Sequence, residues 1–336
     1  MTIRFARSLL AGLALAAIPV VGAFAQNTAI TLVIPNPSAL NVFTVHNAIG
    51  EGYFAEEGLD VTVEAVNGSA SVLQTLASGA GQIGEPGPGP VLAARSRGED
   101  VVFIYNLFVK TGFLLVVPED SDAQSPADLK GTVIGVGTAD GAEVGFTRNM
   151  LSDAGLTEGT DYEFLTVGDG GTAAAAIIGD EVQAYAAAVV DTVIIENSGI
   201  ELRDITPEAY MGYFANGFAA TRDYIDANPE VIEGFGRAIV RGFHFGNDPE
   251  NLEATLAHSA AANPQEAEDA DFARAVFHAV KERMTPIDPS RPYGYQPPED
   301  WEKWHESVVA TGDIPAPLDD LEAAYTNEFI EHWNQE

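Results

Sequence analysis

The feature that most constrains the fold is a strand–helix alternation that occurs twice along the chain. From residue 30 to about residue 108, and again from residue 112 to about residue 206, apolar runs rich in β-branched residues alternate with stretches of helical spacing. This pattern is typical of strands joined by crossover helices, and it predicts parallel sheets with helices on both faces. The chain should therefore be an α/β protein with two successive units and a mostly helical remainder.

The pattern predicts nine strands in these two units and a tenth β-like segment after them. The strands are expected at 30–35, 59–66, 82–85, 101–107, 113–118, 132–135, 162–167, 182–190 and 201–205, and the tenth segment at 212–221. Helices are expected at 41–57, 70–78, 89–97, 141–154, 172–178, 192–197, 249–262, 268–284, 298–311 and 319–329. A further helix should begin after Asn228, a plausible cap, because Val231, Phe235, Ile239 and Phe243 recur at spacings of four.

The order of these segments predicts two Rossmann-like lobes joined by two hinge crossings. Lobe 1 would comprise residues 26–111 and 213–336, with the C-terminal helices packed on it, and lobe 2 would comprise residues 112–212. Two lobes connected in this way form a cleft that can close around a ligand.

The N-terminus has the pattern of a secretory signal peptide. Arg4 and Arg7 precede an apolar stretch at 8–21, and Ala23-Phe24-Ala25 fits a cleavage site. A membrane anchor is the alternative, but the apolar stretch is shorter than the roughly 20 residues that span a bilayer. We expect cleavage before Gln26 and a periplasmic protein.

Composition narrows the possible partners and chemistry. The chain has no cysteine, so disulfides and thiolate chemistry are excluded. Its formal net charge of −34 opposes a phosphate backbone, so nucleic acid is not an expected partner. The acidity has two interpretations, a well-solvated surface or the steering of a cationic ligand.

The motifs of common enzyme classes are absent from the sequence. Gly135, Gly137 and Gly141 give G-x-G-x-x-x-G, one residue longer than the dinucleotide fingerprint. There is no P-loop and no G-x-S-x-G, and the six histidines show no metal-ligand spacing. We therefore expect no catalytic residue, no metal and no cofactor.

A ligand site is expected beyond the carboxyl ends of the strands, where several helices begin. In "NGSAS" and "GTADG", backbone N–H groups, a hydroxyl and a positive helix end come together. The alternative is that Ser69, and Thr138 or Asp140, cap helices. The candidate ligand residues are Asn36, Ser38, Asn41, Ser69, Ala70, Ser71, Glu85 and Pro86 in lobe 1, with Thr138, Asp140, Gly141 and Asp191 in lobe 2.

Four stretches of the chain carry a resemblance to a known family. They are "GYFAEEGLDVTVE" (52–64), "LASGAGQIGEPGPGPVLAA" (76–94), "GEDVVFIYN" (98–106) and "SPADLKGTVIGV" (125–136). In order and spacing the chain resembles periplasmic solute-binding proteins of the nitrate/sulfonate/taurine and thiamine-pyrimidine type. The resemblance implies a type II periplasmic binding protein fold, and a monomer that delivers a small solute to the permease and ATPase of an ABC importer.

Two alternatives share this fold. One is an enzyme branch of the same family that makes the thiamine pyrimidine, which carries a cysteine-rich motif that this chain lacks. The other is a ligand-loaded partner of a membrane sensor.

The charge of the solute is open at this stage. Helix N-termini could hold a sulfonate or nitrate. Glu85, Asp140 and Asp191 would oppose an anion, and Lys110 is the one base near them. These carboxylates favour an aminopyrimidine or another nitrogen-containing, neutral or cationic solute.

Overall fold

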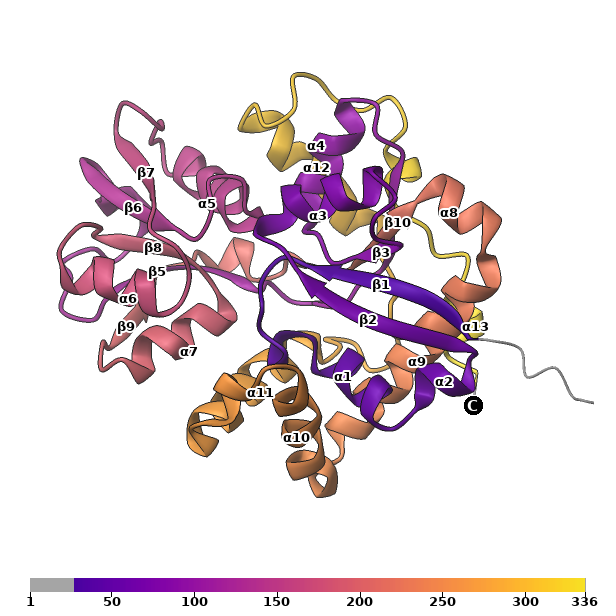
Figure 1. The fold of residues 1–336 in the computed structure, drawn as a ribbon. Helices are drawn as coiled ribbons and strands as arrows, with labels where there is room; N and C mark the ends of the chain where they lie inside the picture. The colour runs from indigo at the N-terminus through magenta and orange to yellow at the C-terminus, as the bar shows by residue number, and fades with distance from the viewer. Residues whose placement is uncertain (1–26, 336) are drawn as a thin grey trace, which may run out of the picture.

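The computed structural model describes residues 27–335, which form two five-stranded sheets flanked by helices (Figure 1). The predicted signal peptide, residues 1–25, lies outside the described residues. Within residues 27–335, no helix has both the length and the apolar character needed to cross a membrane.

The first sheet has the strand order β2-β1-β3-β10-β4. Its strands are β1 (Thr28–Ile34), β2 (Leu59–Ala65), β3 (Ile83–Gly84), β4 (Val101–Tyr105) and β10 (Phe218–Thr221). β1 runs parallel to β2 and β3, whereas β10 is antiparallel to β3 and β4. All five residues of β4 are buried, as expected for a strand covered by helices.

The second sheet has the equivalent order, β7-β6-β8-β5-β9. Its strands are β5 (Phe113–Pro118), β6 (Thr132–Val136), β7 (Tyr162–Thr166), β8 (Ala184–Ala188) and β9 (Leu202–Asp204). β6 is parallel to β7 and β8, and β5 is antiparallel to β8 and β9. The α/β class and the two-lobed architecture are therefore confirmed.

The prediction of wholly parallel sheets was wrong at one strand in each sheet. β10 and β5 follow the two crossings, which connect β9 to β10 and β4 to β5. A strand that enters a sheet directly from the other lobe has no crossover helix to return the chain to the opposite edge, so it runs against its neighbours. The lobe boundaries at residues 112 and 212 stay a prediction.

Helices cover both faces of each sheet. The helices between the strands of the first sheet are α1 (Phe43–Gly50), α2 (Tyr53–Glu56), α3 (Gly68–Ala77) and α4 (Pro88–Ser96). The helices between the strands of the second sheet are α5 (Ala142–Asp153), α6 (Gly171–Ile178) and α7 (Val189–Asn197). The C-terminal region adds α8 (Arg222–Ala227), α9 (Pro229–Asn247), α10 (Leu252–Ala262), α11 (Ala270–Met284), α12 (Pro298–Ala310) and α13 (Ile330–Trp333). Single 3₁₀ turns lie at Leu40–Val42, Pro126–Leu129, Glu208–Tyr210, Pro249–Asn251, Pro264–Ala267 and Leu321–Ala324.

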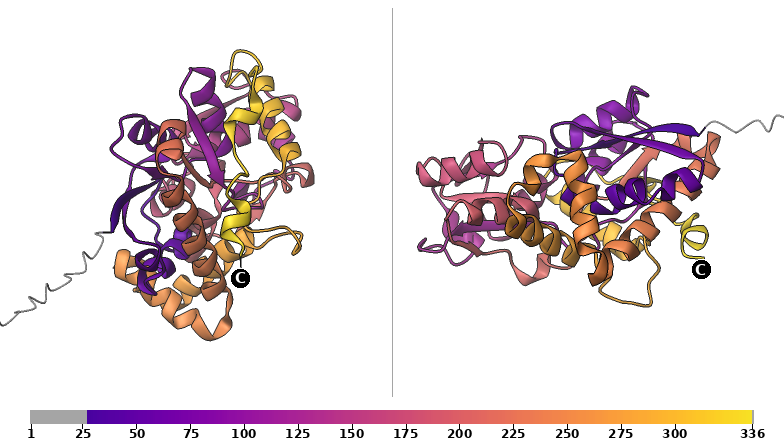
Figure 2. Two further views of the ribbon diagram at one scale, coloured as in Figure 1. Left: turned by 90° about the vertical axis from the view of Figure 1, so that its right-hand side faces the viewer. Right: turned by 60° about the horizontal axis from the view of Figure 1, so that its bottom comes forward.

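The C-terminal helices pack mainly on the first lobe, as predicted. α9 lies against α1 and α2, and α12 lies against α4. α11 also reaches α7 of the second lobe, as the orange and pink helices of Figure 2 show. The C-terminal region thus contributes to both sides of the space between the sheets.

Two predicted helices differ from the structure. The helix expected at 41–57 is interrupted at Gly52, which has φ +77°. A left-handed residue ends a helix because its backbone turns away from the axis. The helix expected at 319–329 is also wrong, because that segment holds one 3₁₀ turn and α13 begins after it.

The amphipathic helix α9 confirms the spacing argument. Val231, Phe235, Ile239 and Phe243 are all buried against the first sheet and α1. Asn228 occupies the N-cap position, but its side-chain amide donates to the carbonyl of Tyr224 instead of capping α9.

The contact between α9 and α1 depends on a glycine, which leads to a prediction. A Cβ at Gly242 would overlap the carbonyl oxygen of Thr44. We expect Gly242→Ala to lower the free energy of unfolding by about 1–3 kcal/mol, despite the better helix propensity of alanine. The control is Gly171→Ala, at a helical glycine with open space around it, which should not destabilise the protein. Equal stability of the two variants in urea unfolding would contradict the close-packing account.

Candidate functional site

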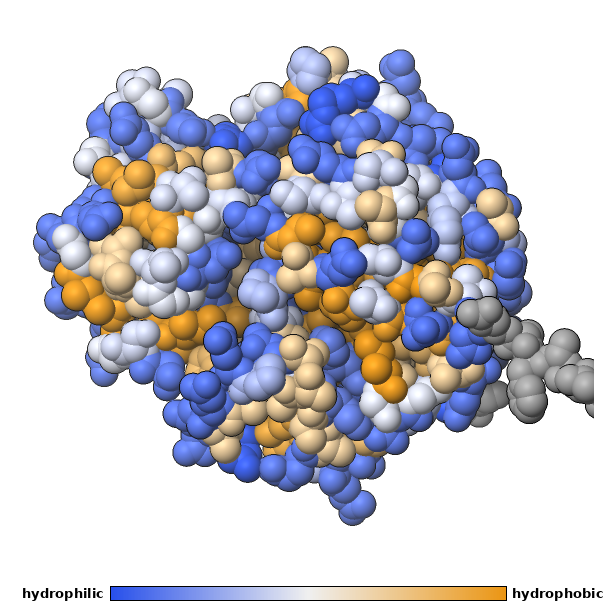
Figure 3. Space-filling model, in the orientation of Figure 1, coloured by the Kyte–Doolittle hydropathy of each residue, from blue (hydrophilic) through white to orange (hydrophobic). Residues whose placement is uncertain are grey.

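A cavity of about 490 Å³ lies between the two sheets and opens at the groove visible in Figure 3. Both lobes and the C-terminal region form its walls. This inter-lobe cavity is lined by Pro35, Asn36, Pro37, Ser38, Gly68, Ser69, Phe113, Thr138, Gly141, Ala142, Glu143, Asp169, Gly170, Gly171, Ala188, Val190, Asp191, Ile194, Asn216, Asn263, Gln265, Glu266 and Phe272. Its volume lies within the roughly 300–1,000 Å³ typical of small-molecule sites.

The first-lobe wall is built where β1 and β2 end. The chain turns after β1 through Asn36, whose Oδ1 accepts a hydrogen bond from the N–H of Ser38 at 3.0 Å. Ser69, in the first turn of α3, accepts from the N–H of Gly87 at 3.1 Å, which ties α3 to the start of α4. These bonds fix the loops that face the second lobe.

The second-lobe wall carries three carboxylates. Asp191, in the first turn of α7, accepts from the N–H groups of Gly170 and Ala188, each at 3.0 Å. Glu143 is in the first turn of α5, and its side chain lies against the backbone of Gly141. Any residue with a Cβ at position 141 would overlap the Glu143 carboxylate. The third carboxylate, Asp169, precedes α6.

These carboxylates are in an environment that disfavours their charged forms. Burial raises the pKa of Glu143 to about 8, and the neighbouring Asp191 and Asp169 add to the shift. Burial and Asp169 raise the pKa of Asp191 to about 7, against the opposing effect of its two N–H donors. Burial also raises the pKa of Asp169. The wall therefore carries protons near neutral pH that a cation or a donor could displace.

No lysine, arginine or histidine is among the cavity-lining residues that the structure describes. A fourth acid, Glu266 from the C-terminal region, lines the opposite side and accepts from the N–H groups of Ala39 and Leu40 at 3.0 and 3.1 Å. An anion in this cavity would meet no side-chain counter-charge, and it would further disfavour ionisation of the lining acids. A molecule that donates hydrogen bonds would be favoured.

Several buried oxygen atoms at this site lack hydrogen-bond partners among the described residues. They include Thr138 Oγ1 and Asn216 Oδ1, whose side chains line the cavity. Both side-chain oxygens of Glu85 also lack partners among the described residues. The backbone carbonyl of Glu85 accepts a hydrogen bond from the side-chain amide of Asn216 at 3.3 Å. Burial raises the pKa of Glu85 to about 8, so this carboxyl group is mostly neutral at pH 7. A buried polar atom without a partner is costly, and a ligand in the cavity can reduce that cost at Thr138 and Asn216, which line it.

The structure brings half of the predicted site residues to the cavity. Asn36, Ser38, Ser69, Thr138, Gly141 and Asp191 line it. Asn41, Ala70, Ser71, Glu85, Pro86 and Asp140 do not line it. Glu85 is fully buried beside Asn216, whereas Ala70 and exposed Asp140 line a neighbouring groove on the α3–α5 side. Ligand contact stays a prediction for each of the twelve.

The capping alternative does not account for these residues. α3 begins at Gly68 and α5 at Ala142, and neither helix has a side-chain hydrogen bond at its N-cap. Ser69 bonds to Gly87, and Thr138 Oγ1 has no partner among the described residues.

Sequence reasoning missed several lining residues. Asp169 follows the strand predicted at 162–167 by two residues, and Glu143 is two residues after Gly141, so both had a usable signal. Glu266 and Phe272 had none, because nothing in the sequence says which C-terminal helix crosses to the cleft. Within the described residues, no group of three or more acidic, histidine or cysteine side chains is arranged to hold a metal ion.

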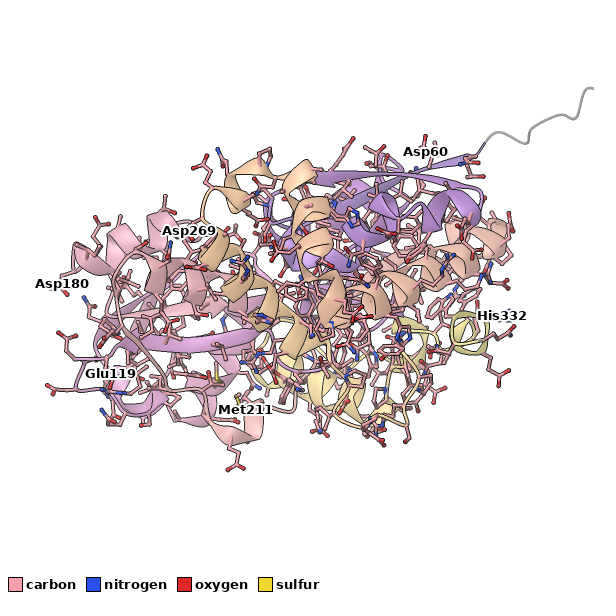
Figure 4. All side chains as sticks on the ribbon, turned by 90° about the horizontal axis from the view of Figure 1, so that it is seen from below. Asp60, Glu119, Asp180, Met211, Asp269 and His332 are labelled. Atoms are coloured by element: carbon pink, nitrogen blue, oxygen red, sulfur yellow. The ribbon has the colours of Figure 1, made fainter. Side chains whose placement is uncertain are left out.

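The outer surface is acidic as well. The exposed Asp60, Glu119 and Asp180 lie at the periphery of the molecule in Figure 4, on both lobes. These exposed acids are separate from the carboxyl groups of the inter-lobe cavity.

The two lobes approach each other closely at the starts of α3, α4 and α5. A Cβ at Gly68 would lie 2.8 Å from Thr138 Oγ1, and a Cβ at Gly87 would overlap that of Ala142. Arg148 of α5 also pairs with Asp313, which follows α12, at 2.5 Å. These glycines let the loops of opposite lobes approach closely.

Comparisons with known proteins agree with this architecture. Residues 40–251 match the family described as NMT1/THI5 like. The chain is 28% identical over 306 residues to the formylaminopyrimidine-binding protein of Halalkalibacterium halodurans, an alignment that covers 84% of this chain and 88% of that protein. It is 28% identical over 302 residues to the riboflavin-binding protein RibY of Chloroflexus aurantiacus, with 84% and 80% covered.

A solved structure supports the fold. The alkanesulfonate-binding protein SsuA of Xanthomonas axonopodis pv. citri superposes with a TM-score of 0.70, over 90% of this chain and 99% of that chain, at 17% identity. At that identity the likeness concerns the fold alone.

The buried carboxyl group of Glu85 predicts a pH-dependent stability. Its pKa is 4.5 in the reference state and about 8 in the folded protein, so between these values the folded state holds a proton that the unfolded state has lost. Raising the pH through this interval lowers stability. We expect Glu85→Gln to exceed the wild type by roughly 1–4 kcal/mol at pH 8 and by less than about 1 kcal/mol at pH 5. Urea unfolding at both pH values measures this, with exposed Glu163→Gln as the control. A Glu85→Gln effect that does not change with pH would contradict the shifted pKa.

Proposed function

The chain belongs to the NMT1/THI5-like family, and from this premise we propose that it is the extracytoplasmic solute-binding component of an ABC importer. It captures a small molecule in the inter-lobe cavity and presents it to the permease. The observation that carries the proposal is a cavity of about 490 Å³ lined from both lobes. The two curated relatives are themselves named as binding proteins.

The solute that best fits this cavity is a nitrogen-containing molecule that donates hydrogen bonds and is neutral or cationic. Three acids line one wall and a fourth lines the other, with no basic side chain among the described lining residues. Phe113 and Phe272 give the same cavity two aromatic walls, which suit a planar ring. The names of the two curated relatives specify a formylaminopyrimidine and riboflavin, both nitrogen heterocycles that bear N–H groups.

The positive ends of the helices do not reverse this preference. An exposed helix N-terminus attracts anions, but α5 and α7 each carry a carboxylate in the first turn, Glu143 and Asp191. These side chains stand where an anionic solute would otherwise gain from the helix ends. A sulfonate or nitrate could therefore bind there only if these acids stayed protonated, whereas a donor or a cation could bind to their ionised forms.

Solute capture would stabilise the closed arrangement of the lobes. Arg148 of α5 pairs with Asp313 at 2.5 Å and with Glu158 at 2.7 Å, and its guanidinium is partly buried. Partial burial limits the screening of this pair by solvent. The Arg148–Asp313 pair joins the two lobes on the side of the neighbouring groove, so it favours closure without contacting the solute.

A thermal-shift screen tests the proposed solute class. A ligand at 100 times its dissociation constant adds about 2.7 kcal/mol to stability. We expect stabilisation by a formylaminopyrimidine, riboflavin or a simple diamine such as putrescine, and none by methanesulfonate or nitrate. Stabilisation by the anions alone would overturn the charge argument.

Glu143→Gln provides the matched variant for that screen, since it keeps the size of the side chain and removes its ability to ionise when a donor or a cation binds. For a compound that stabilises the wild type through a charge-assisted hydrogen bond, affinity should fall by the equivalent of about 1.5–3 kcal/mol, measured by titration calorimetry. Glu181→Gln, at an exposed position of the same lobe, should leave affinity unchanged. Equal affinity of the wild type and Glu143→Gln would show that the Glu143 carboxylate does not bind the solute.

Export is the remaining prediction for this function. The proposed role requires the chain to leave the cytoplasm, and the N-terminal pattern places the cleavage after Ala25. N-terminal sequencing of the protein recovered from the periplasm should begin at Gln26. Recovery of the whole product in the cytoplasm with Met1 retained would contradict it.

A further inference from the structure

A second cavity, of about 330 Å³, lies against the two crossings between the lobes. Asn106, Leu107 and Val109 of the first crossing and Gly212 of the second line it. The loop between α11 and α12 forms the rest of its outer wall. We call it the hinge cavity. Among the described residues it shares no lining residue with the inter-lobe cavity.

Four of the twenty residues that line the hinge cavity are aromatic. Tyr105, Phe243, Tyr293 and Tyr295 line it, and the rings of Phe243 and Tyr293 lie 4.9 Å apart. A backbone hydrogen bond of 3.1 Å from Asn106 N–H to the carbonyl of Gly294 holds the loop to the first crossing. A planar ring can be placed against such walls by stacking or edge-to-face contact.

Two buried polar groups of this cavity lack hydrogen-bond partners within the part of the chain that the structure describes. They are Thr44 Oγ1 and Asn106 Oδ1, at residues that are 0% and 4% exposed. Thr44 lies on α1 and Asn106 on the crossing, so they belong to different segments of the chain. Buried polar groups are almost always paired, and an unpaired group in a cavity wall indicates a missing partner.

The charges at the rim compensate one another. Arg291 lies 3.6 Å from Glu299, and Lys303 lies 3.2 Å from Asp300. The remaining rim acid, Asp288, accepts hydrogen bonds from Ser290. The cavity therefore offers no free basic group to an anion, and its interior polar groups are uncharged.

We propose that the hinge cavity is a second small-molecule site, which takes a neutral aromatic compound bearing an N–H or O–H group. The aromatic walls bind the ring, and Thr44 and Asn106 pair with the polar group. This site is independent of the solute that the inter-lobe cavity takes.

Indole is the probe for this proposal, because it is small, neutral and aromatic and carries one N–H donor. In amide ¹H–¹⁵N spectra of the wild-type protein, indole should cause saturable shifts at Asn106, Gly294 and their neighbours, with a dissociation constant in the millimolar range. Cyclohexanol, which is neutral but not aromatic, should bind at least tenfold more weakly. No saturable shift up to the solubility limit of indole, or shifts confined to the inter-lobe cavity, would overturn the proposal.

Two variants test the assignment of the site. Ile287→Trp places a larger side chain at the rim, at a residue that is 67% exposed, so the fold should be retained. It should weaken indole binding at least tenfold. Thr44→Val is close in shape, removes an unpaired hydroxyl and should weaken binding at least threefold. Glu143→Gln should leave indole binding unchanged, which separates this site from the inter-lobe cavity. Wild-type affinity in Ile287→Trp would refute the proposal.

Discussion

A carboxylate that leaves water must recover its lost hydration from hydrogen bonds, a counter-ion or a proton. Three carboxyl groups of this protein are buried in this way. Glu143 lies at the start of α5, Asp191 at the start of α7 and Glu85 in the turn between β3 and α4. Asp191 obtains two backbone donors, and Glu85 obtains none among the described residues. Glu143 and Asp191 line the inter-lobe cavity, so a solute that donates hydrogen bonds there would favour the ionised forms of these two carboxyl groups.

The same fold therefore supports different ligand chemistry. Solved neighbours of this fold include a protein named for alkanesulfonate and another named for nitrate. In this chain the N-termini of α5 and α7, which could otherwise bind an anion, each carry an acidic residue in the first turn, Glu143 and Asp191. A fold positions loops and helix ends at a cleft, and the side chains placed there determine what binds.

The sequence predicted the two-lobed α/β architecture because the strand–helix alternation and the α9 periodicity are local signals. It did not predict the reversed direction of β5 and β10, which depends on how the chain crosses between lobes. The stretches after the strands correctly indicated the cavity at Asn36, Ser69, Thr138 and Asp191. Phe272 was beyond sequence reasoning because its approach to the cleft depends on the packing of α11 against α7, and Glu266 was too because it lies in the 3₁₀ turn before α11.

The most direct test of the central claim is the proton count on solute binding. Titration calorimetry of one stabilising solute at pH 7, in buffers of different ionisation enthalpy, gives the number of protons exchanged per complex. With the pKa of Glu143 near 8 and that of Asp191 near 7, both groups are partly protonated before binding. A cation or a donor lowers these pKa values, so the account predicts that binding releases protons. Net proton uptake, which is what an anionic solute would cause, would contradict it.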